Sequence, residues 1–195
     1  MTGDSLINSC AMKRRDFFKL PPAAVIITST GLSGDANAAE LRREILVDAG
    51  SDRDRDPITF LDATFDVKVS GKDTEGRCVI FDTIRHKKVG PAFHLHTDCD
   101  EWFFVRDGEF KFKVGDKILH LKSGDSLMVP RETPHAFVKT SEGDARLIVM
   151  HQPAVKMEEF FRVTSKLPDQ SPDARKRIAE QSYGMRFIGP PLSAY

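Results

Sequence analysis

The chain has 195 residues, 40% of them hydrophobic and 30% charged, and its formal net charge is zero. This length fits one domain with an appendage and can bury a core of its own. The apolar content is too high for a disordered chain, and the balanced charge argues against capture of nucleic acid by bulk electrostatics. Three cysteines, Cys10, Cys78 and Cys99, are too few for a disulfide scaffold.

The N-terminal segment 1–38 has the pattern of an export signal. Residues 13–20 read Lys-Arg-Arg-Asp-Phe-Phe-Lys-Leu, a weakly apolar stretch covers 21–32, and residues 36–38 form an Ala-Asn-Ala cleavage cue. About 20 uninterrupted apolar residues are needed to span a bilayer, so we expect no permanent membrane anchor. The alternative reading is an ordinary basic N-terminus.

The pair Arg14-Arg15, followed by x-Phe-x-Lys, resembles the twin-arginine signal of bacteria. Lys13 and Phe18 stand where that signal usually has Ser or Thr and Leu. The resemblance implies that the twin-arginine export machinery is a partner and that the protein is periplasmic or secreted, exported in its folded state. Cleavage after Ala38 leaves 25 basic and 26 acidic residues.

Two questions stay open at the level of sequence. Met12 opens a more usual signal segment than Met1, so translation could begin at either residue. Cys78 and Cys99 remain after cleavage and would face an oxidising compartment, where pairing depends on a geometry that the sequence does not reveal.

Residues 55–152 are expected to form an all-β barrel. Phe65, Val67 and Val69 alternate with polar neighbours, which is the two-residue period of a half-buried strand. Turn pairs such as Asp107-Gly108 separate the runs at hairpin spacing. Further strands are expected at 78–85, 92–96, 101–106, 109–114, 117–121, 126–129, 135–139 and 145–151. Many short strands about ten residues apart predict an antiparallel sandwich or barrel.

Residues 153–195 differ in pattern and predict a helical extension. Segment 155–164 lacks turn residues and favours a helix. The tripeptide 171–173 (Ser-Pro-Asp) suits a second helix start, and Gly184 suits its end. Residues 188–192 are expected to be extended because of their prolines. We expect this tail to pack on the barrel or to form a dimer interface.

Three histidines and one glutamate form the candidate metal site. His94 and His96 are two apart on an expected strand, so their imidazoles share a face. Glu101 starts the next strand, and His135 follows a later turn. Three imidazole nitrogens and one carboxylate oxygen suit a divalent first-row metal, which could be Fe, Mn, Ni, Co, Cu or Zn. The alternative is a hydrogen-bonded cluster without metal, although burial would make that arrangement costly.

Two spaced motifs in this region resemble those of the cupin superfamily. They read His94-x-His96-x4-Glu101-x6-Gly108 and Gly124-x5-Pro130-x4-His135. The resemblance is strict over residues 90–135 and extends over 57–152 in strand layout. It implies a double-stranded β-helix, or jelly-roll barrel, with one metal ion bound inside by His94, His96, Glu101 and His135.

Three positions depart from the cupin pattern. Gly90 is separated from His94 by three residues rather than the usual five, so the turn before that strand is shorter. Glu132 replaces a glycine that usually lies between the proline and the last histidine, and it adds a charge near the expected mouth. Lys139 replaces an asparagine. None of these is a ligand position.

The remaining polar candidates are assigned to the fold rather than to chemistry. His86 lies within the basic run 85–88 and is expected at a solvated strand end. His120 is expected on an outer face, and His151 at the surface or as a structural hydrogen-bonding residue. Cys99 is expected to be a loop residue rather than a thiolate ligand.

Strand alternation also assigns the large apolar side chains to faces. Phe103 and Val105 share the face of Glu101 and are predicted to wall the pocket. The opposite face, expected under the tail or a partner subunit, carries Phe93, Leu95, Trp102 and Phe104.

The resemblance implies a single-domain, quercetinase-like dioxygenase that acts on an aromatic or enolic small molecule. Glu101 is the expected catalytic residue, as a ligand or as a displaced base that takes a proton from an acidic hydroxyl. A sugar isomerase or epimerase without redox chemistry is an alternative, and it would need inward cations such as Arg106 or Lys139. A metal- or ligand-binding cupin without turnover is another. The family resemblance also implies a homodimer.

Overall fold

The computed structural model describes residues 44–195. The expected signal segment 1–38, with Arg14 and Arg15, lies outside the described residues, as does Cys10. The elements in chain order are β1 (Ile58–Phe60), β2 (Ala63–Val69), β3 (Val79–Arg85), β4 (Ala92–His96), β5 (Asp100–Asp107), β6 (Glu109–Val114), β7 (Lys117–Lys122), β8 (Ser126–Val129), β9 (His135–Lys139), β10 (Ala145–Gln152), α1 (Met157–Ser165), α2 (Pro172–Ser182) and β11 (Met185–Pro191).

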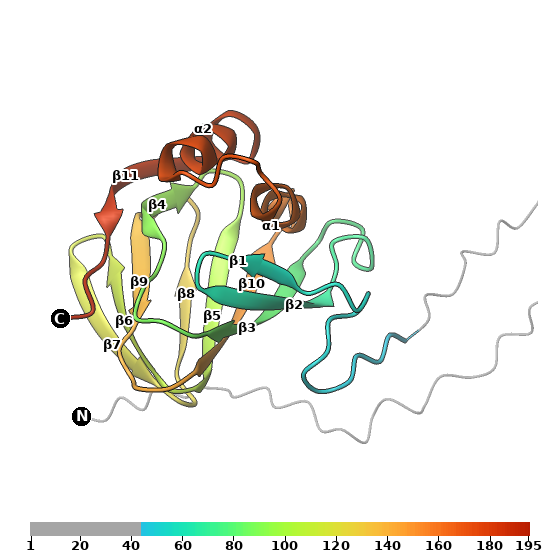
Figure 1. The fold of residues 1–195 in the computed structure, drawn as a ribbon, viewed down its shortest axis with the longest axis horizontal. Helices are drawn as coiled ribbons and strands as arrows, with labels where there is room; N and C mark the ends of the chain where they lie inside the picture. The colour runs from blue at the N-terminus through green and yellow to red at the C-terminus, as the bar shows by residue number, and fades with distance from the viewer. Residues whose placement is uncertain (1–43) are drawn as a thin grey trace, which may run out of the picture. The chain divides into compact units, whose positions relative to one another are not determined.

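The strands form two sheets that face each other. One sheet has the order β1-β2-β3-β10-β5-β8 and the other has the order β11-β4-β9-β6-β7. Neighbouring strands pair antiparallel, as β10 does with both β3 and β5. Figure 1 shows the two sheets wrapped around a common interior, with α1 and α2 at one end. The predicted all-β jelly-roll barrel with a C-terminal helical extension is confirmed.

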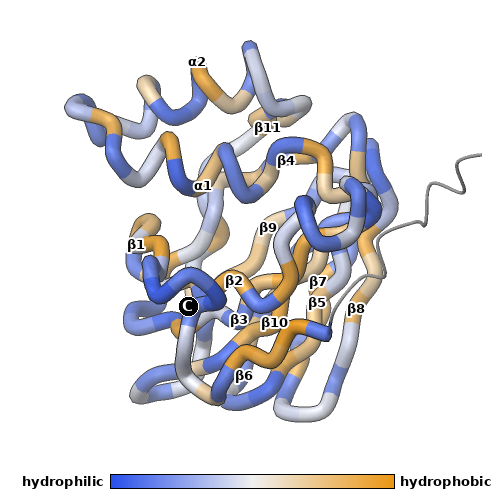
Figure 2. The backbone as a smooth tube through the Cα atoms, turned by 90° about the vertical axis from the view of Figure 1, so that its right-hand side faces the viewer, coloured by the Kyte–Doolittle hydropathy of each residue, from blue (hydrophilic) through white to orange (hydrophobic). Residues whose placement is uncertain are grey.

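Two hydrophobic clusters fill the interior, because alternate side chains along each strand point inward. The sheet cluster consists of strand residues alone: Phe103, Val105, Phe110, Phe112, Leu121, Val129, Phe137, Ala145, Leu147 and Val149. The tail cluster joins strand residues to the tail, and includes Phe65, Val67, Phe81, Met157, Phe160, Phe161, Tyr183 and Met185. Figure 2 shows hydrophobic residues along the strands and on parts of the helices, and hydrophilic residues at many of the turns.

The tail contributes a strand as well as two helices. Ser171 caps α2 by accepting a hydrogen bond from the backbone N–H of Ala174 at 3.2 Å, as its sequence indicated. The segment expected to be merely extended is β11, which pairs antiparallel with β4, so that Met185 lies opposite His96. The tail therefore continues the sheet that carries three of the candidate metal ligands, His94 and His96 on β4 and His135 on β9.

The two cysteines in the described part of the chain do not form a disulfide. Cys78 and Cys99 are free thiols, and Cys99 is buried. Burial is the main cause that raises the pKa of Cys99, to about 12, so it stays protonated and is a poor metal ligand.

No helix within residues 44–195 has both the length and the apolar character needed to cross a membrane. His86 and His120 are exposed, as expected.

Candidate metal centre

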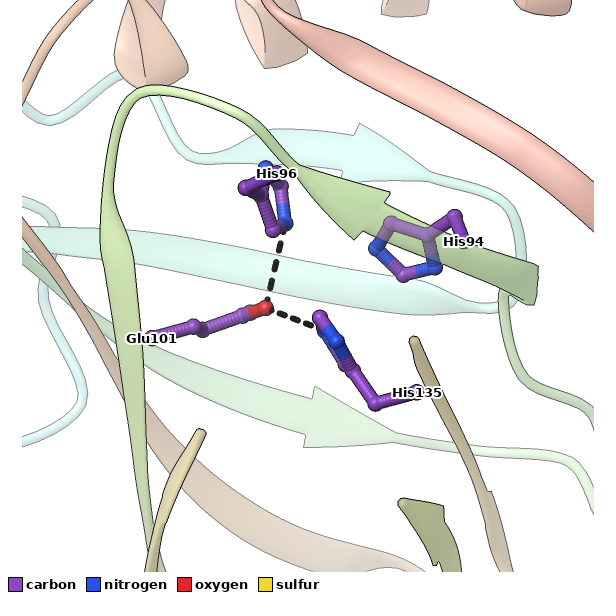
Figure 3. Close-up of side chains that lie close together, drawn as sticks. All are labelled: His94, His96, Glu101 and His135. Atoms are coloured by element: carbon purple, nitrogen blue, oxygen red, sulfur yellow. Dashed lines mark hydrogen bonds and ion pairs between the residues drawn. The ribbon is translucent and has the colours of Figure 1, made fainter. Parts of the chain in front are cut away.

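Three strands bring the four motif residues together, β4 and β9 from one sheet and β5 from the other. His94 and His96 point inward from β4, and the register places His94 directly opposite His135 at the start of β9. Glu101 enters from β5. All four side chains are buried, and their ligand atoms lie within 4.8 Å of one another. Figure 3 shows the three imidazoles and the carboxylate pointing toward a common point.

Glu101 is the centre of this cluster. Its Oε2 lies 2.8 Å from Nε2 of His135 and 3.1 Å from Nε2 of His96, the two contacts dashed in Figure 3. One carboxylate oxygen thus approaches two imidazoles at once. This convergence of donor atoms on one side of the carboxylate is typical of residues that share a cation.

Backbone carbonyls fix two of the imidazole rings. Nδ1–H of His94 donates to the carbonyl oxygen of Ala92 at 2.7 Å, and Nδ1–H of His135 donates to the carbonyl oxygen of Thr133 at 2.9 Å. In both rings the proton on Nδ1 leaves Nε2 as the metal-facing atom. Such second hydrogen bonds orient histidine ligands and raise their basicity.

The protonation of the cluster is set by burial and by mutual charge. Burial lowers the pKa of His94 well below its ordinary value and also lowers that of His96. For His135, burial opposes a charged ring, but the hydrogen bond and charge of Glu101 raise its pKa. Burial alone would raise the pKa of Glu101, yet His151, His135 and His96 hold it well below its usual range. The cluster therefore holds an ionised carboxylate beside His94 and His96, where burial favours the neutral ring, and beside His135, where the carboxylate favours the protonated one.

The donor set fits a divalent metal ion better than a closed hydrogen-bond network. Both ring nitrogens of His96 are buried without a hydrogen bond to a residue that the structure describes, and Nε2 has a polar contact with Oε2 of Glu101 at 3.1 Å. A buried nitrogen without a partner is costly, and a bound cation would satisfy it. Donor atoms sharing one ion at about 2.0–2.2 Å each lie within about 4.4 Å of one another, close to the observed spread.

His151 lies beside the four cluster residues. Of the two positions expected for it, the surface is wrong because the side chain is completely buried, whereas a structural polar contact agrees with its Nε2, which lies 3.3 Å from Oε1 of Glu101. Its ring centroid is 5.3 Å from that of His96. The signal was available in the alternation of β10, where Leu147, Val149 and His151 share the inward face.

A cavity of about 530 Å³ opens beside the cluster, and His94, His96, Glu101 and His151 line it. Phe103 and Val105 do point inward, but they belong to the sheet cluster and not to the cavity wall that was predicted for them. The wall is mostly apolar and rich in phenylalanine, and its large side chains come chiefly from the tail and the first strands: Phe60, Phe65, Phe137, Met157, Phe160, Phe161, Met185 and Phe187.

The cations that line this cavity, Arg85, Arg175 and Lys176, are not the two expected from the sequence. Arg106 is exposed and pairs with Asp82, and buried Lys139 donates to the carbonyl oxygens of His86 and Gly143. Neither lines the cavity. Arg85, expected at a solvated strand end, is instead 4% exposed and lines the cavity from β3. Its inward position follows from parity, because it shares a face with Phe81 and Thr83.

Two of the departures from the cupin pattern have structural reasons. Glu132 has φ of +61°, a left-handed conformation that favours glycine, and its N–H donates to the carbonyl oxygen of His96 at 2.7 Å. Its side chain is exposed and does not line the cavity, contrary to the expected charge near the mouth. Gly90 lies against β9, where an added Cβ would meet the carbonyl oxygen of Phe137 at 1.7 Å.

Comparison with known proteins gives a family match over part of the chain. Residues 81–151, which include the four cluster residues and His151, match the Cupin_2 family model, described as a cupin domain. Protein SchB of Streptomyces halstedii is 26% identical over 81 residues, which are 42% of this chain. The match spans 59% of the length of that relative.

Solved structures resemble about half of the chain. KdgF from Halomonas sp. has a TM-score of 0.46 and 18% identity, covering 51% of this chain and 87% of that one. The polyketide cyclase RemF from Streptomyces resistomycificus has a TM-score of 0.42 and 19% identity, covering 47% of this chain and 65% of that one. These distant likenesses bear on neither substrate nor mechanism. Residues 81–151 are thus similar to a cupin domain, and in this structure they form part of a two-sheet barrel with an inward His and Glu cluster.

Proposed function

We propose that this protein is a metal-dependent dioxygenase of the quercetinase-like type that acts on an aromatic or enolic small molecule. The observation that carries the proposal is the position of the three-histidine, one-glutamate cluster on the wall of a cavity lined by phenylalanine. An apolar pocket with a few convergent polar groups is the usual form of a small-molecule site. The aromatic wall suits a flat, apolar substrate body.

The chain's own residues have separate roles in this reaction. A bound divalent metal would supply Lewis acidity toward a substrate oxygen, and dioxygen is the oxidant whose two atoms enter the product. Nε2 atoms of His94 and His135, fixed by their Nδ1–H bonds to backbone carbonyls, would hold the ion together with His96 and Glu101. Glu101 accepts the proton of an acidic substrate hydroxyl, and His151 holds the opposite carboxylate oxygen.

The cavity favours this reaction over sugar isomerisation. A sugar substrate needs several polar or cationic groups to hold its hydroxyls, and the two cations expected for that purpose, Arg106 and Lys139, are engaged elsewhere. Arg85, Arg175 and Lys176 do line the cavity. Most of its wall is nevertheless apolar and includes the rings of Phe60, Phe161 and Phe187. A non-catalytic binding protein differs from the dioxygenase in turnover alone, and the experiment below separates the two.

Oxygen uptake is the direct test. Protein loaded in turn with Fe, Mn, Ni, Co, Cu or Zn is mixed with flavonols, catechols and enolic ketones, and oxygen consumption is followed with an electrode. We expect consumption with at least one metal and substrate, and its loss in His96→Ala together with stoichiometric metal. His120→Ala is the matched control, because His120 is exposed on β7. Saturable ligand binding without oxygen uptake at any metal would contradict the proposal.

We also propose that the protein is exported in its folded state by the twin-arginine machinery. The support is the Arg14-Arg15 pair and the Ala-Asn-Ala cue at 36–38. Folding before export would let the cytoplasm set the metal, since divalent affinity otherwise rises toward Cu. Fractionation of a bacterial host should find wild-type protein in the periplasm and the Arg14→Lys/Arg15→Lys variant in the cytoplasm. The same distribution for both would refute the proposal.

A further inference from the structure

Arg85 is a buried cation whose side chain is incompletely paired. It lines the cavity with His94, His96 and Glu101, and only 4% of its surface is exposed. Its Nε is buried and has no hydrogen-bond partner within residues 44–195. A guanidinium carries five N–H donors, so leaving them unpaired in an interior is costly.

The one carboxylate paired with Arg85 does not satisfy it. Oδ1 of Asp62 lies 4.0 Å from Nη1 of Arg85, beyond hydrogen-bond distance, and this oxygen has no hydrogen-bond partner among the described residues either. The other carboxylate oxygen of Asp62 accepts the backbone N–H of Lys87 at 3.1 Å. Asp62 thus balances charge at a distance and leaves the donors of the guanidinium free.

Aromatic rings hold the guanidinium in place within the cavity. Its Cζ lies 4.9 Å from the ring centroid of Phe65 on β2 and 4.9 Å from that of Phe137 on β9. Stacking of this kind covers the guanidinium plane and leaves its N–H edge for a planar acceptor. Burial is the main cause that lowers the pKa of Arg85, to about 10, which still leaves it charged at neutral pH.

Positive charge outweighs negative charge around the cavity. Arg85, Arg175 and Lys176 line it together with Glu101 and Asp173, and Asp62 lies beside Arg85. A bound divalent ion would add two positive charges, so the site favours an anion, and a carboxylate would offer two oxygens to the free guanidinium edge, the pairing that arginine forms best. The apolar wall accommodates the rest of the molecule.

We propose that Arg85 binds the carboxylate of the substrate, so that the substrates are aromatic or enolic carboxylic acids. This inference rests on the proposed function, and it names the substrate class for the same site. Arg85 is then the residue that determines specificity, while the metal cluster acts on another oxygen of the same molecule.

Matched acids and amides test the assignment by binding. Zn-loaded protein is titrated calorimetrically with two catechol acids, protocatechuate and o-pyrocatechuate, and with the carboxamide of each, so that only the charged group differs. We expect at least one acid to bind about 10- to 100-fold more tightly than its amide. In Arg85→Met this preference should fall to within about twofold, while the affinity for the amide stays unchanged.

Two further variants keep the test decisive. Arg106→Met removes an equal charge from outside the cavity and should leave the preference intact. Because Arg85→Met leaves Asp62 without its cation, Asp62→Asn/Arg85→Met is measured beside it, with thermal unfolding of both. No preference in wild type, or an equal preference in the Arg85 variants, would overturn the inference.

The same proteins separate this inference from the proposed function. Acid preference that depends on Arg85, without oxygen uptake at any metal, would leave the carboxylate site standing and refute the dioxygenase. Oxygen uptake with neutral substrates that is unaffected by Arg85→Met would do the reverse.

Discussion

The sheet cluster and the tail cluster are built from the same kinds of side chain and differ in what surrounds them. In the sheet cluster, Phe103, Phe112 and Phe137 interlock at ring distances of 5.0–5.5 Å, and every member lies on a strand. In the tail cluster, Phe160 and Phe161 come from a helix and face the cavity. One cluster closes the barrel, while the other leaves space beside the metal ligands.

The difference shows how one barrel can combine rigidity with a binding site. Packed interiors tolerate little loss of volume, because neighbouring strands cannot move independently. A helix that rests on a barrel can shift toward a gap more easily than a strand held by two ladders. The strands therefore fix the metal ligands, and the tail sets the shape of the space around them.

Truncating one phenylalanine in each cluster should give the largest measurable difference between the two clusters. Phe112→Ala is expected to reduce the free energy of unfolding by about 3–5 kcal/mol, because the ring is fully buried between strands. Phe160→Ala should cost about 1–3 kcal/mol, because the side chain borders an existing cavity and α1 can settle toward it. Urea unfolding of both variants measures the two losses, and equal values would contradict the proposed difference between the clusters.

The contrast between the clusters also explains what the sequence could predict. The expected strands at 92–96, 109–114, 126–129 and 135–139 match β4, β6, β8 and β9. Of these strands β6 alternates cleanly, and the turn residues between the runs mark the ends of the others, so the local signal is strong. The convergence of the four motif residues followed from the same alternation plus the spacing of the motif.

The rest depended on packing between distant segments. Arg85 and His151 lie at inward-facing positions of their strands, but polar side chains usually indicate an exposed position. Nothing in the neighbouring sequence reveals that each of them faces a carboxylate. The cavity wall at Phe160 and Phe187 arises because the tail folds back across the barrel and β11 pairs with β4. The three-residue strand β1 is too short to show a period.

Removing His151 should weaken metal binding without opening the barrel. His151→Leu is expected to lower metal affinity by about 10- to 100-fold, because the carboxylate of Glu101 loses the group that orients its second oxygen. His151→Gln keeps a donor and should lose less. Competition with a chelator measures the affinity, and His86→Leu, at an exposed histidine bonded to Asp144, is the control. Unchanged affinity in His151→Leu would show that this residue only fills space.

The smallest expected effect concerns the turn that leads into β9. Glu132 has φ of +61°, a conformation that costs an L-residue about 1–2 kcal/mol and that glycine adopts without strain. Glycine also makes the unfolded chain more flexible, which lowers the free energy of unfolding by about 0.5–1 kcal/mol. Glu132→Gly should therefore raise the free energy of unfolding by about 0.5–1 kcal/mol, and Glu132→Ala should not. Urea unfolding measures both changes.

Metal affinity should stay unchanged in Glu132→Gly. The turn is held by the hydrogen bond from the backbone N–H of residue 132 to the carbonyl oxygen of His96, and glycine retains that donor. His135 is then positioned by its register opposite His94 rather than by the side chain at 132. Glu132→Gly could instead prove more stable but bind metal more weakly. That result would mean that the conformation of this turn helps to position His135, and that the strand register alone does not fix the four ligands.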